Sequence, residues 1–191
     1  STHALGREAR AFADEARSRC AEILGCTPRE ILFTHSGTEA NNLALFGLTR
    51  SAARGKKHVV ISSIEHESVR QAAFALRQRN FSVSEVPVNS EGRIEVSALQ
   101  ETLRPDSALL SFVVGNNEVG VVQDVRVLAD AARKISPDIR VHIDACQYAP
   151  FSDLDVRSLG IDALTCNSSK LCGPKGAGML FVREGVALEP I

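Results

Sequence analysis

Short apolar segments alternate with helix-like segments along nearly the whole chain, and this alternation constrains the fold more than any other feature. The apolar segments are residues 31–34, 58–61, 82–86, 109–114, 140–144, 163–166 and 178–182, and the helix-like segments are 3–24, 38–53, 66–79, 97–102 and 124–135. Continuous apolar strands are typical of a mostly parallel sheet whose two faces are both covered by helices. We therefore predict an α/β fold with three layers, a mixed but mostly parallel central sheet of about seven strands, and one domain over residues 1–191.

The composition excludes several classes of protein. The formal net charge is −1, so the chain has no basic field that would attract nucleic acid or an anionic membrane. No apolar run approaches the roughly 18 residues of a membrane-spanning helix, and the polar start does not resemble a signal or transit peptide. The five cysteines follow neither a disulfide nor a zinc-binding spacing. We expect a cytoplasmic protein with reduced thiols, no metal site, and no nucleic-acid or membrane partner.

Polar residues follow five of the predicted strands at the point where each strand ends. These strand ends run into Ser36-Gly37-Thr38, Glu65-His66-Glu67, Asn116-Asn117-Glu118, Asp144-Ala145-Cys146-Gln147 and Asn167-Ser168-Ser169-Lys170. In open α/β sheets, ligands bind at the carboxyl ends of the strands. The five groups are therefore expected to form one pocket if the strands are parallel.

Each group alone has both a functional and an ordinary explanation. Gly37 and Thr38 open a helix, where free N–H groups bind an anion such as phosphate, but a simple helix cap has the same sequence. Asp144 would stabilise a protonated pyridine nitrogen, or it would cap the local backbone. Gln147 would donate to a phenolic oxygen, or it would lie in solvent. His66 would stack on a flat cofactor or transfer a proton, or it would be an ordinary polar histidine.

Two lysines compete for the role of nucleophile. A lysine in a concave polar pocket can act as a nucleophile and then as a general base, and Lys170 follows a strand end. Lys175 sits in a Gly-Pro-Lys-Gly turn, where an exposed lysine is the usual outcome. Taken alone, Lys170 could also be an ordinary lysine exposed to solvent. None of these signals is specific alone, and their joint occurrence in this order carries the functional interpretation.

Five ordered motifs resemble those of the cysteine desulfurases, in the class V aminotransferase group of fold-type I pyridoxal-phosphate enzymes. The motifs are Thr34-His35-Ser36-Gly37-Thr38-Glu39-Ala40-Asn41-Asn42, Glu65-His66-Glu67, Asn116-Asn117-Glu118-Val119-Gly120-Val121-Val122-Gln123-Asp124, His142-Ile143-Asp144-Ala145-Cys146-Gln147 and Ser169-Lys170-Leu171-Cys172-Gly173-Pro174-Lys175-Gly176. The resemblance extends from near the start of the chain to near its end.

The resemblance implies a role in holding the cofactor ring for four residues. Lys170 resembles the lysine that holds pyridoxal 5'-phosphate as a Schiff base, and Asp144 resembles the partner of the pyridine nitrogen. Gln147 would donate a hydrogen bond to the ring oxygen. His66 would stack on the ring and handle protons, so that Lys170 and His66 are the predicted catalytic residues.

The resemblance also implies ligands for the phosphate and the substrate. Gly37, Thr38 and Ser169 resemble phosphate ligands, and Asn117 would lie near the cofactor oxygen and the substrate carboxylate. The family usually has Gly-His where Ser168 and Ser169 stand. Because a serine hydroxyl can still donate to phosphate, we keep both serines as predicted cofactor ligands.

The implied reaction removes sulfur from L-cysteine, which gives L-alanine and a persulfide on a protein cysteine for iron–sulfur clusters or thiolated RNA. The family chain begins earlier and continues into a smaller domain that carries this cysteine, so we expect residues 1–191 to be the cofactor-binding large domain of an incomplete enzyme. Cys146, where the family often has Thr, is not expected to be the sulfur acceptor. We expect a homodimer in the full-length enzyme and sulfur-acceptor or scaffold proteins as partners. The alternatives are a selenocysteine lyase, a cysteine-sulfinate desulfinase, another class V aminotransferase, or a cofactor-binding fragment without full activity.

Overall fold

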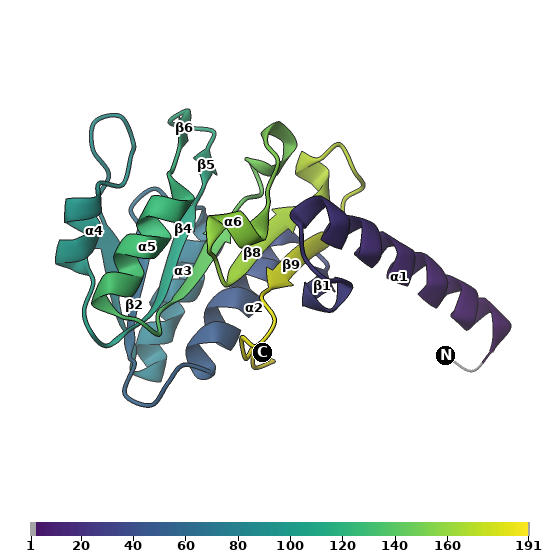
Figure 1. The fold of residues 1–191 in the computed structure, drawn as a ribbon, viewed down its shortest axis with the longest axis horizontal. Coiled ribbons are helices and arrows are strands. Elements are labelled where there is room, and N and C mark those ends of the chain that lie inside the picture. Colours follow the sequence, from purple (N-terminus) through teal and green to yellow (C-terminus); the bar gives the residue numbers. More distant parts are fainter. Residues whose placement is uncertain (1–2, 191) are drawn as a thin grey trace.

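The computed structural model describes residues 3–190, in which a seven-stranded sheet lies between two layers of helices (Figure 1). The strands of this sheet are β1 (Ile31–Thr34), β2 (His58–Ser62), β3 (Ser82–Val86), β4 (Ser107–Val113), β7 (Arg140–Asp144), β8 (Ala163–Asn167) and β9 (Gly178–Val182). The helices are α1 (Ala4–Leu24), α2 (Gly37–Arg50), α3 (Glu67–Leu76), α4 (Val96–Thr102), α5 (Val125–Ile135) and α6 (Val156–Leu159). The predicted three-layer α/β fold is confirmed.

The sheet has the strand order β1-β9-β8-β7-β4-β2-β3. Strands β3, β2, β4, β7 and β8 pair in parallel, whereas β9 is antiparallel to both of its neighbours, β1 and β8. Because two antiparallel pairings restore the original direction, β1 runs the same way as β8. The sheet is therefore mixed and mostly parallel, as predicted, and the carboxyl ends of every strand except β9 meet at one edge.

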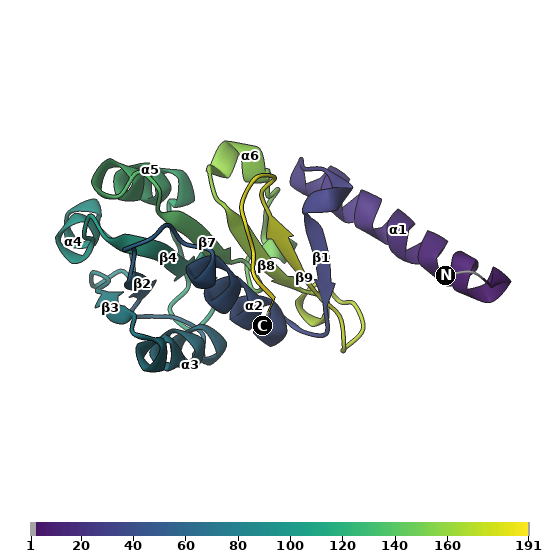
Figure 2. The same cartoon turned by 90° about the horizontal axis from the view of Figure 1, so that it is seen from below.

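Each face of the sheet is covered by its own group of helices and its own apolar core. Figure 2 shows α2 and α3 along one face and α4, α5 and α6 along the other. Leu48 and Leu76 are fully buried in the first core, and Leu99 and Leu128 are buried in the second. All residues of β2 and β4 are buried because both faces of these strands are covered. This two-sided burial explains their continuous apolar sequences.

Helix α1 begins and ends close to its predicted limits, but its apolar stripe does not lie in the core. Leu5, Phe12 and Ile23 are 76%, 66% and 74% exposed, and within α1 only Ala21 and Leu24 are buried. The helix extends away from the sheet at the side of β1 (Figure 1). The apolar periodicity therefore identified the helix correctly, but most of its apolar residues pack against no other element within residues 3–190.

Three short elements were not predicted. Strands β5 (Gly115–Asn116) and β6 (Val121–Val122) form a small antiparallel pair after β4, and α6 is a helix of four residues. Two residues are too few to show the alternation of a strand, and four residues form about one turn of a helix. None of the helices in residues 3–190 combines the length and the apolar character that a membrane crossing requires.

Candidate functional site

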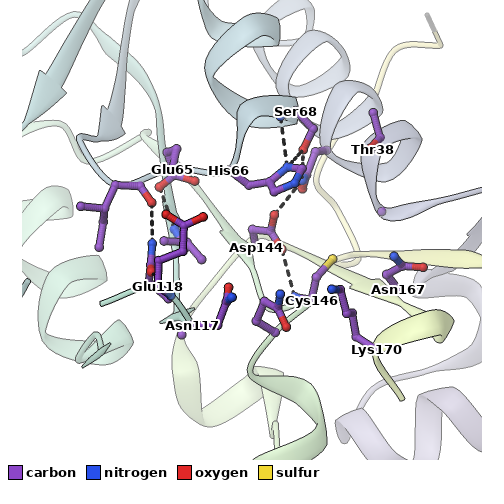
Figure 3. A pocket seen from close by; sticks show the side chains of 17 residues that line it. Thr38, Glu65, His66, Ser68, Asn117, Glu118, Asp144, Cys146, Asn167 and Lys170 are labelled. Carbon is purple, nitrogen blue, oxygen red and sulfur yellow. Dashed lines mark hydrogen bonds between the residues drawn. The ribbon is translucent and has the colours of Figure 1, made fainter. Parts of the chain in front are cut away.

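A pocket opens at the sheet edge where the carboxyl ends of the parallel strands meet. Its walls include residues that follow β1, β2, β4, β7 and β8, namely Gly37, Thr38, Glu65, His66, Asn117, Asp144, Gln147, Asn167 and Lys170. Figure 3 shows the side chains of Thr38, His66, Asn117, Asp144 and Lys170 around one space. The predicted convergence of polar strand ends is therefore observed, and it follows from the common direction of the five strands.

Asp144 is the deepest charged group of the pocket. It ends β7, is 3% exposed, and receives a hydrogen bond on each carboxylate oxygen. The Asn41 side-chain amide donates to Oδ2 at 2.7 Å, and the Cys146 backbone N–H donates to Oδ1 at 2.9 Å. Hydrogen bonds to the charged form stabilise a buried carboxylate. Both oxygens of the Asp144 carboxyl group are therefore held by donors within the pocket lining.

His66 lies at the pocket wall just before α3, in the position that caps the helix. Its Nδ1 accepts the Ser68 backbone N–H at 3.1 Å and lies 2.8 Å from the Ser68 hydroxyl oxygen. The residue is exposed, and its ring borders the pocket (Figure 3). Because Nδ1 accepts a hydrogen bond, the proton of the neutral ring resides on Nε2.

Glu65 is a second carboxyl group in the pocket, and it is bonded on one side only. Its Oε1 accepts the Val113 backbone N–H at 2.7 Å and the Ser62 hydroxyl, whereas Oε2 is buried without a partner among residues 3–190. Burial, and then the nearby Asp144 carboxylate, raise the pKa of Glu65 from 4.5 to about 8. Glu65 is therefore a neutral carboxylic acid at pH 7.

His142 lies in β7 two residues before Asp144. It is fully buried between Ser111 and Thr165, whose hydroxyl oxygens lie 2.8 Å from Nδ1 and 3.0 Å from Nε2. Burial lowers the pKa of His142 to about 4, although the Asp144 carboxylate acts in the opposite direction. His142 is therefore neutral at pH 7 and adds no positive charge beneath the pocket.

The N-terminus of α2 faces the pocket with Gly37 and Thr38. Ser36 caps the helix, because its hydroxyl oxygen accepts the Glu39 N–H at 3.1 Å. Both explanations considered for this motif are thus compatible with the geometry, since a capped helix start still presents backbone N–H groups and a positive helix end. A Cβ atom at Gly37 would lie 2.8 Å from the Cys146 sulfur, so α2 packs closely on the loop after β7.

The Cys146 thiol borders the pocket but is not activated. Burial, followed by the effect of the Asp144 carboxylate, raises the pKa of this thiol well above its ordinary value. Because the thiolate is the nucleophilic form, a raised pKa weakens Cys146 as a nucleophile, and the expectation that it is not the sulfur acceptor stays a prediction. All five cysteines are free.

Lys170 and Lys175 have different surroundings. Lys170 ends a 3-10 helix (Ser168–Lys170) directly after β8 and lines the pocket. Both lysines are exposed, but Lys175 lies in the following turn and outside the pocket lining. Figure 3 shows Lys170 and Asp144 in the same pocket. The geometry therefore favours Lys170 over Lys175 as the amine that meets a ligand.

Ser168 and Ser169 are the two predicted ligands that do not line the pocket. The Ser168 hydroxyl donates to the Pro174 backbone oxygen, and Ser169 is exposed. Their contact with a phosphate group stays a prediction. The other seven predicted residues, Gly37, Thr38, His66, Asn117, Asp144, Gln147 and Lys170, all line the pocket.

Two buried residues of the site, Asn41 and Ser68, were given no role by the sequence. Asn41 lies four residues after Gly37 in α2, so both residues are on the face of the helix that meets the sheet. An asparagine on an otherwise apolar buried face was the available signal, because a buried amide needs partners. Within the described part of the chain, no three His, Cys, Asp or Glu side chains are grouped to hold a metal ion.

Comparisons with known proteins agree on one family. The chain matches the family described as Aminotransferase class-V over residues 1–191. The cysteine desulfurase IscS 1 of Archaeoglobus fulgidus is 38% identical over 191 residues, which are 100% of this chain and 49% of that protein. The mitochondrial cysteine desulfurase of Drosophila melanogaster is 38% identical over 192 residues, which are 100% of this chain and 41% of that protein.

Solved structures show the same relationship. A NifS-like protein superposes with a TM-score of 0.95 and 32% identity, over 100% of this chain and 52% of that chain. The structure of SspA in complex with cysteine superposes with a TM-score of 0.93 and 34% identity, over 100% of this chain and 55% of that chain. The chain spans about half the length of the relatives that it matches.

Proposed function

This chain belongs to the class-V aminotransferase family, and from that premise we propose that its pocket binds pyridoxal 5'-phosphate and that residues 1–191 form the cofactor-binding large domain of a cysteine desulfurase. The observation that carries the proposal is the placement of the Lys170 amine and the Asp144 carboxylate in one pocket, at which α2 also begins. Relatives named cysteine desulfurase, 38% identical over the whole chain, support the choice of reaction.

The residues present fit this cofactor. A phosphorylated pyridine aldehyde needs a carboxylate for its ring nitrogen, an amine for its aldehyde and an anion site for its phosphate. Asp144 supplies the carboxylate, Lys170 the amine, and the α2 N-terminus at Gly37 and Thr38 the anion site. When bound, pyridoxal phosphate supplies an electron sink for the bonds of the substrate that are to be broken.

The chain's own residues then orient the ring and move protons. Asp144 holds a proton on the ring nitrogen, and Gln147 donates a hydrogen bond to the ring oxygen. Lys170 would hold the cofactor through its amine, and the same amine would serve as a general base. His66 lines the pocket, where it would pack on the ring, and its Nε2–H would be free to donate. Asn117, on the loop after β5, binds the substrate carboxylate.

We propose L-cysteine as the substrate and L-alanine with a protein-bound persulfide as the products. The similar structure of SspA in complex with cysteine supports this choice of amino acid. The complete protein is proposed to be a cytoplasmic homodimer that passes sulfur to acceptor or scaffold proteins. Phe151, which is 82% exposed, and Val122, which is 42% exposed, line a hollow that shares Asn117 and Gln147 with the pocket, and they suit such a subunit contact.

The other class V reactions differ in the group that leaves the amino acid. A selenocysteine lyase releases selenium and a cysteine-sulfinate desulfinase releases sulfite, both with alanine, whereas an aminotransferase forms a keto acid. Incubating the protein, expressed from its complete gene, with each amino acid and measuring these products separates the reactions. Cofactor binding without any product would favour a binding domain that lacks full activity.

The assignment of the lysine can be tested without turnover. The wild-type protein is expected to be yellow with bound pyridoxal phosphate, to lose the colour with borohydride, and then to carry the reduced cofactor on the Lys170 peptide in mass spectrometry. Lys170→Ala should abolish the visible band and the adduct. Lys175→Ala should keep both, because Lys175 lies outside the pocket. A Lys170→Ala protein that still forms the adduct would disprove the assignment.

A further inference from the structure

The Asn41 amide is a buried contact between two parts of the pocket. Asn41 is 1% exposed, and its Nδ2 lies 2.7 Å from Asp144 Oδ2 and 2.9 Å from Ser68 Oγ. An amide nitrogen carries two hydrogens, so these two acceptors use both of them. The opposite orientation of the amide would place Asn41 Oδ1 against the Asp144 carboxylate, where two acceptors repel. The negative charge of Asp144 therefore fixes the orientation of Asn41.

This orientation determines the direction of the next hydrogen bond. Because Asn41 donates to Ser68 Oγ, the hydroxyl hydrogen of Ser68 remains available for His66 Nδ1, which lies 2.8 Å away. The Ser68 backbone N–H donates to the same Nδ1 at 3.1 Å. Both donors point at one nitrogen, so Nδ1 of the neutral ring carries no proton and the Nε2–H is left for the pocket.

Burial makes this arrangement difficult to replace with water. Asn41, Ser68 and Asp144 are 1%, 8% and 3% exposed, and Asn41 Oδ1 has no partner among residues 3–190. Both hydrogens of the Asn41 amide are used in hydrogen bonds, whereas its oxygen has none. The orientation of the amide is therefore set by its two acceptors, Asp144 and Ser68. Hydrogen bonds in a buried chain also polarise one another, so a change at one end affects the other.

We propose that Asn41 and Ser68 are positioning residues that couple Asp144 to His66. They fix the position of Asp144, the proposed partner of the ring nitrogen, relative to His66, the proposed residue on the ring face. We call this chain of hydrogen bonds the Asn41–Ser68 relay. The role of the relay in cofactor binding rests on the proposed function, whereas its hydrogen bonds do not depend on it. The relay adds a second donor to His66 Nδ1, beside the Ser68 backbone N–H, and gives Asp144 a donor on Oδ2.

The test follows the ring nitrogen resonances of His66 by NMR in isotope-labelled protein, with the assignment made by a His66→Gln variant. Asn41→Leu removes an amide that has no hydrogen bond to His66. It should nevertheless shift these resonances, because Asn41 acts on His66 through Ser68. Ser68→Ala should shift them as well, and Ser68→Thr, which keeps a hydroxyl, should restore them. Asn42→Leu is the matched control, because the Asn42 amide donates only to the Thr38 oxygen within α2, and it should leave them unchanged.

Cofactor affinity supplies a second measurement. Asn41→Leu and Ser68→Ala should each weaken pyridoxal-phosphate binding about tenfold, and the double variant should bind no more weakly than the single variants, because members of one relay are not additive. Additive losses, or His66 resonances that do not move in a folded Asn41→Leu protein, would overturn the proposal. If Asn41→Leu does not fold, unchanged His66 resonances in Ser68→Ala would overturn it.

The two proposals fail separately. The His66 resonances are measured without cofactor, so their shift supports the relay even in a protein that binds no pyridoxal phosphate, a result that would reject the proposed function. Tight cofactor binding together with unmoved resonances would reject the relay and leave the proposed function standing.

Discussion

Two carboxyl groups share the pocket, and they differ in their hydrogen bonds. Asp144 accepts a nitrogen donor on each oxygen, whereas Glu65 accepts donors on Oε1 only and leaves Oε2 without a partner in the described chain. Two adjacent buried carboxylates are costly, so one of them retains a proton. Burial, and then the nearby Asp144 carboxylate, raise the pKa of Glu65 to about 8, so Glu65 retains its proton at pH 7.

This proton predicts how stability depends on pH. The pKa of Glu65 is about 8 in the folded protein and 4.5 in a solvated reference, so between these values the folded state binds the extra proton. The stabilisation by Glu65 is complete below pH 4.5 and is lost as the pH rises through 8. The unfolding free energy of the wild type, minus that of Glu65→Gln, should fall by up to about 1.4 kcal/mol per pH unit in this range.

Urea unfolding of the two proteins at several pH values between 5 and 8 measures this difference. Glutamine keeps an oxygen for the Val113 N–H and the Ser62 hydroxyl but does not titrate, and the other titrating groups are common to both proteins. The same pH dependence in wild type and variant would show that Glu65 is already ionised when the protein is folded.

The sequence predicted the pocket residues that follow strand ends, because their position depends only on strand direction. Asp144, Lys170 and His66 could be placed in this way. Asn41 and Ser68 could not, because they act through partners that are distant in sequence: Asn41 lies 103 residues from Asp144 and 27 from Ser68. Such pairings depend on how α2 and α3 lie on the sheet.

At the scale of elements, hydrophobic patterning located the long helices and the strands but not the relation of β9 to its neighbours. An apolar run of five residues is equally compatible with a parallel or an antiparallel central strand. The reversal of β9 follows from its short connection to β8, which passes through the turn after Lys170. The four-residue helix α6 and the β5–β6 pair were below the length at which a pattern can be recognised.

The close approach of α2 to the loop after β7 predicts a coupled pair of substitutions. A Cβ at Gly37 would lie 2.8 Å from Cys146 Sγ and 3.2 Å from Asn167 Cβ. Gly37→Ala should therefore reduce the unfolding free energy by about 1–3 kcal/mol through overpacking. Adding Cys146→Ala removes the sulfur and should recover most of this loss. Urea unfolding of both single variants and the double variant gives the coupling energy, and a purely additive result would contradict the contact.

At the scale of the whole molecule, the order of the strands brings together loops that are far apart in the chain. Strands β8, β7, β4 and β2 are neighbours in the sheet although helices separate them in sequence. The sequence predicted that a parallel sheet would gather its carboxyl ends, but it could not give this order, because order is set by how the crossing helices pack. The edge of the sheet at the amino ends of these strands contributes no residue to the pocket lining. A substitution at that edge is therefore expected to change the stability of the fold without changing ligand binding.

Asp162 tests this separation, because it joins three elements at the edge opposite the pocket. It is fully buried before β8, and its carboxylate pairs with Arg133 of α5 at 2.9 Å and with Arg183 after β9. It also accepts the backbone N–H of Val141 in β7 at 2.8 Å.

Asp162→Ala should reduce the unfolding free energy by about 3 kcal/mol, because the Val141 N–H loses its acceptor and the arginines lose a shared partner. Asp162→Asn keeps an acceptor for the N–H and should cost less. Urea unfolding gives both values, and the visible spectrum per folded molecule should match that of the wild type. A folded Asp162→Ala protein with impaired cofactor binding would show that this edge of the sheet, across the length of β7 and β8, helps to shape the pocket.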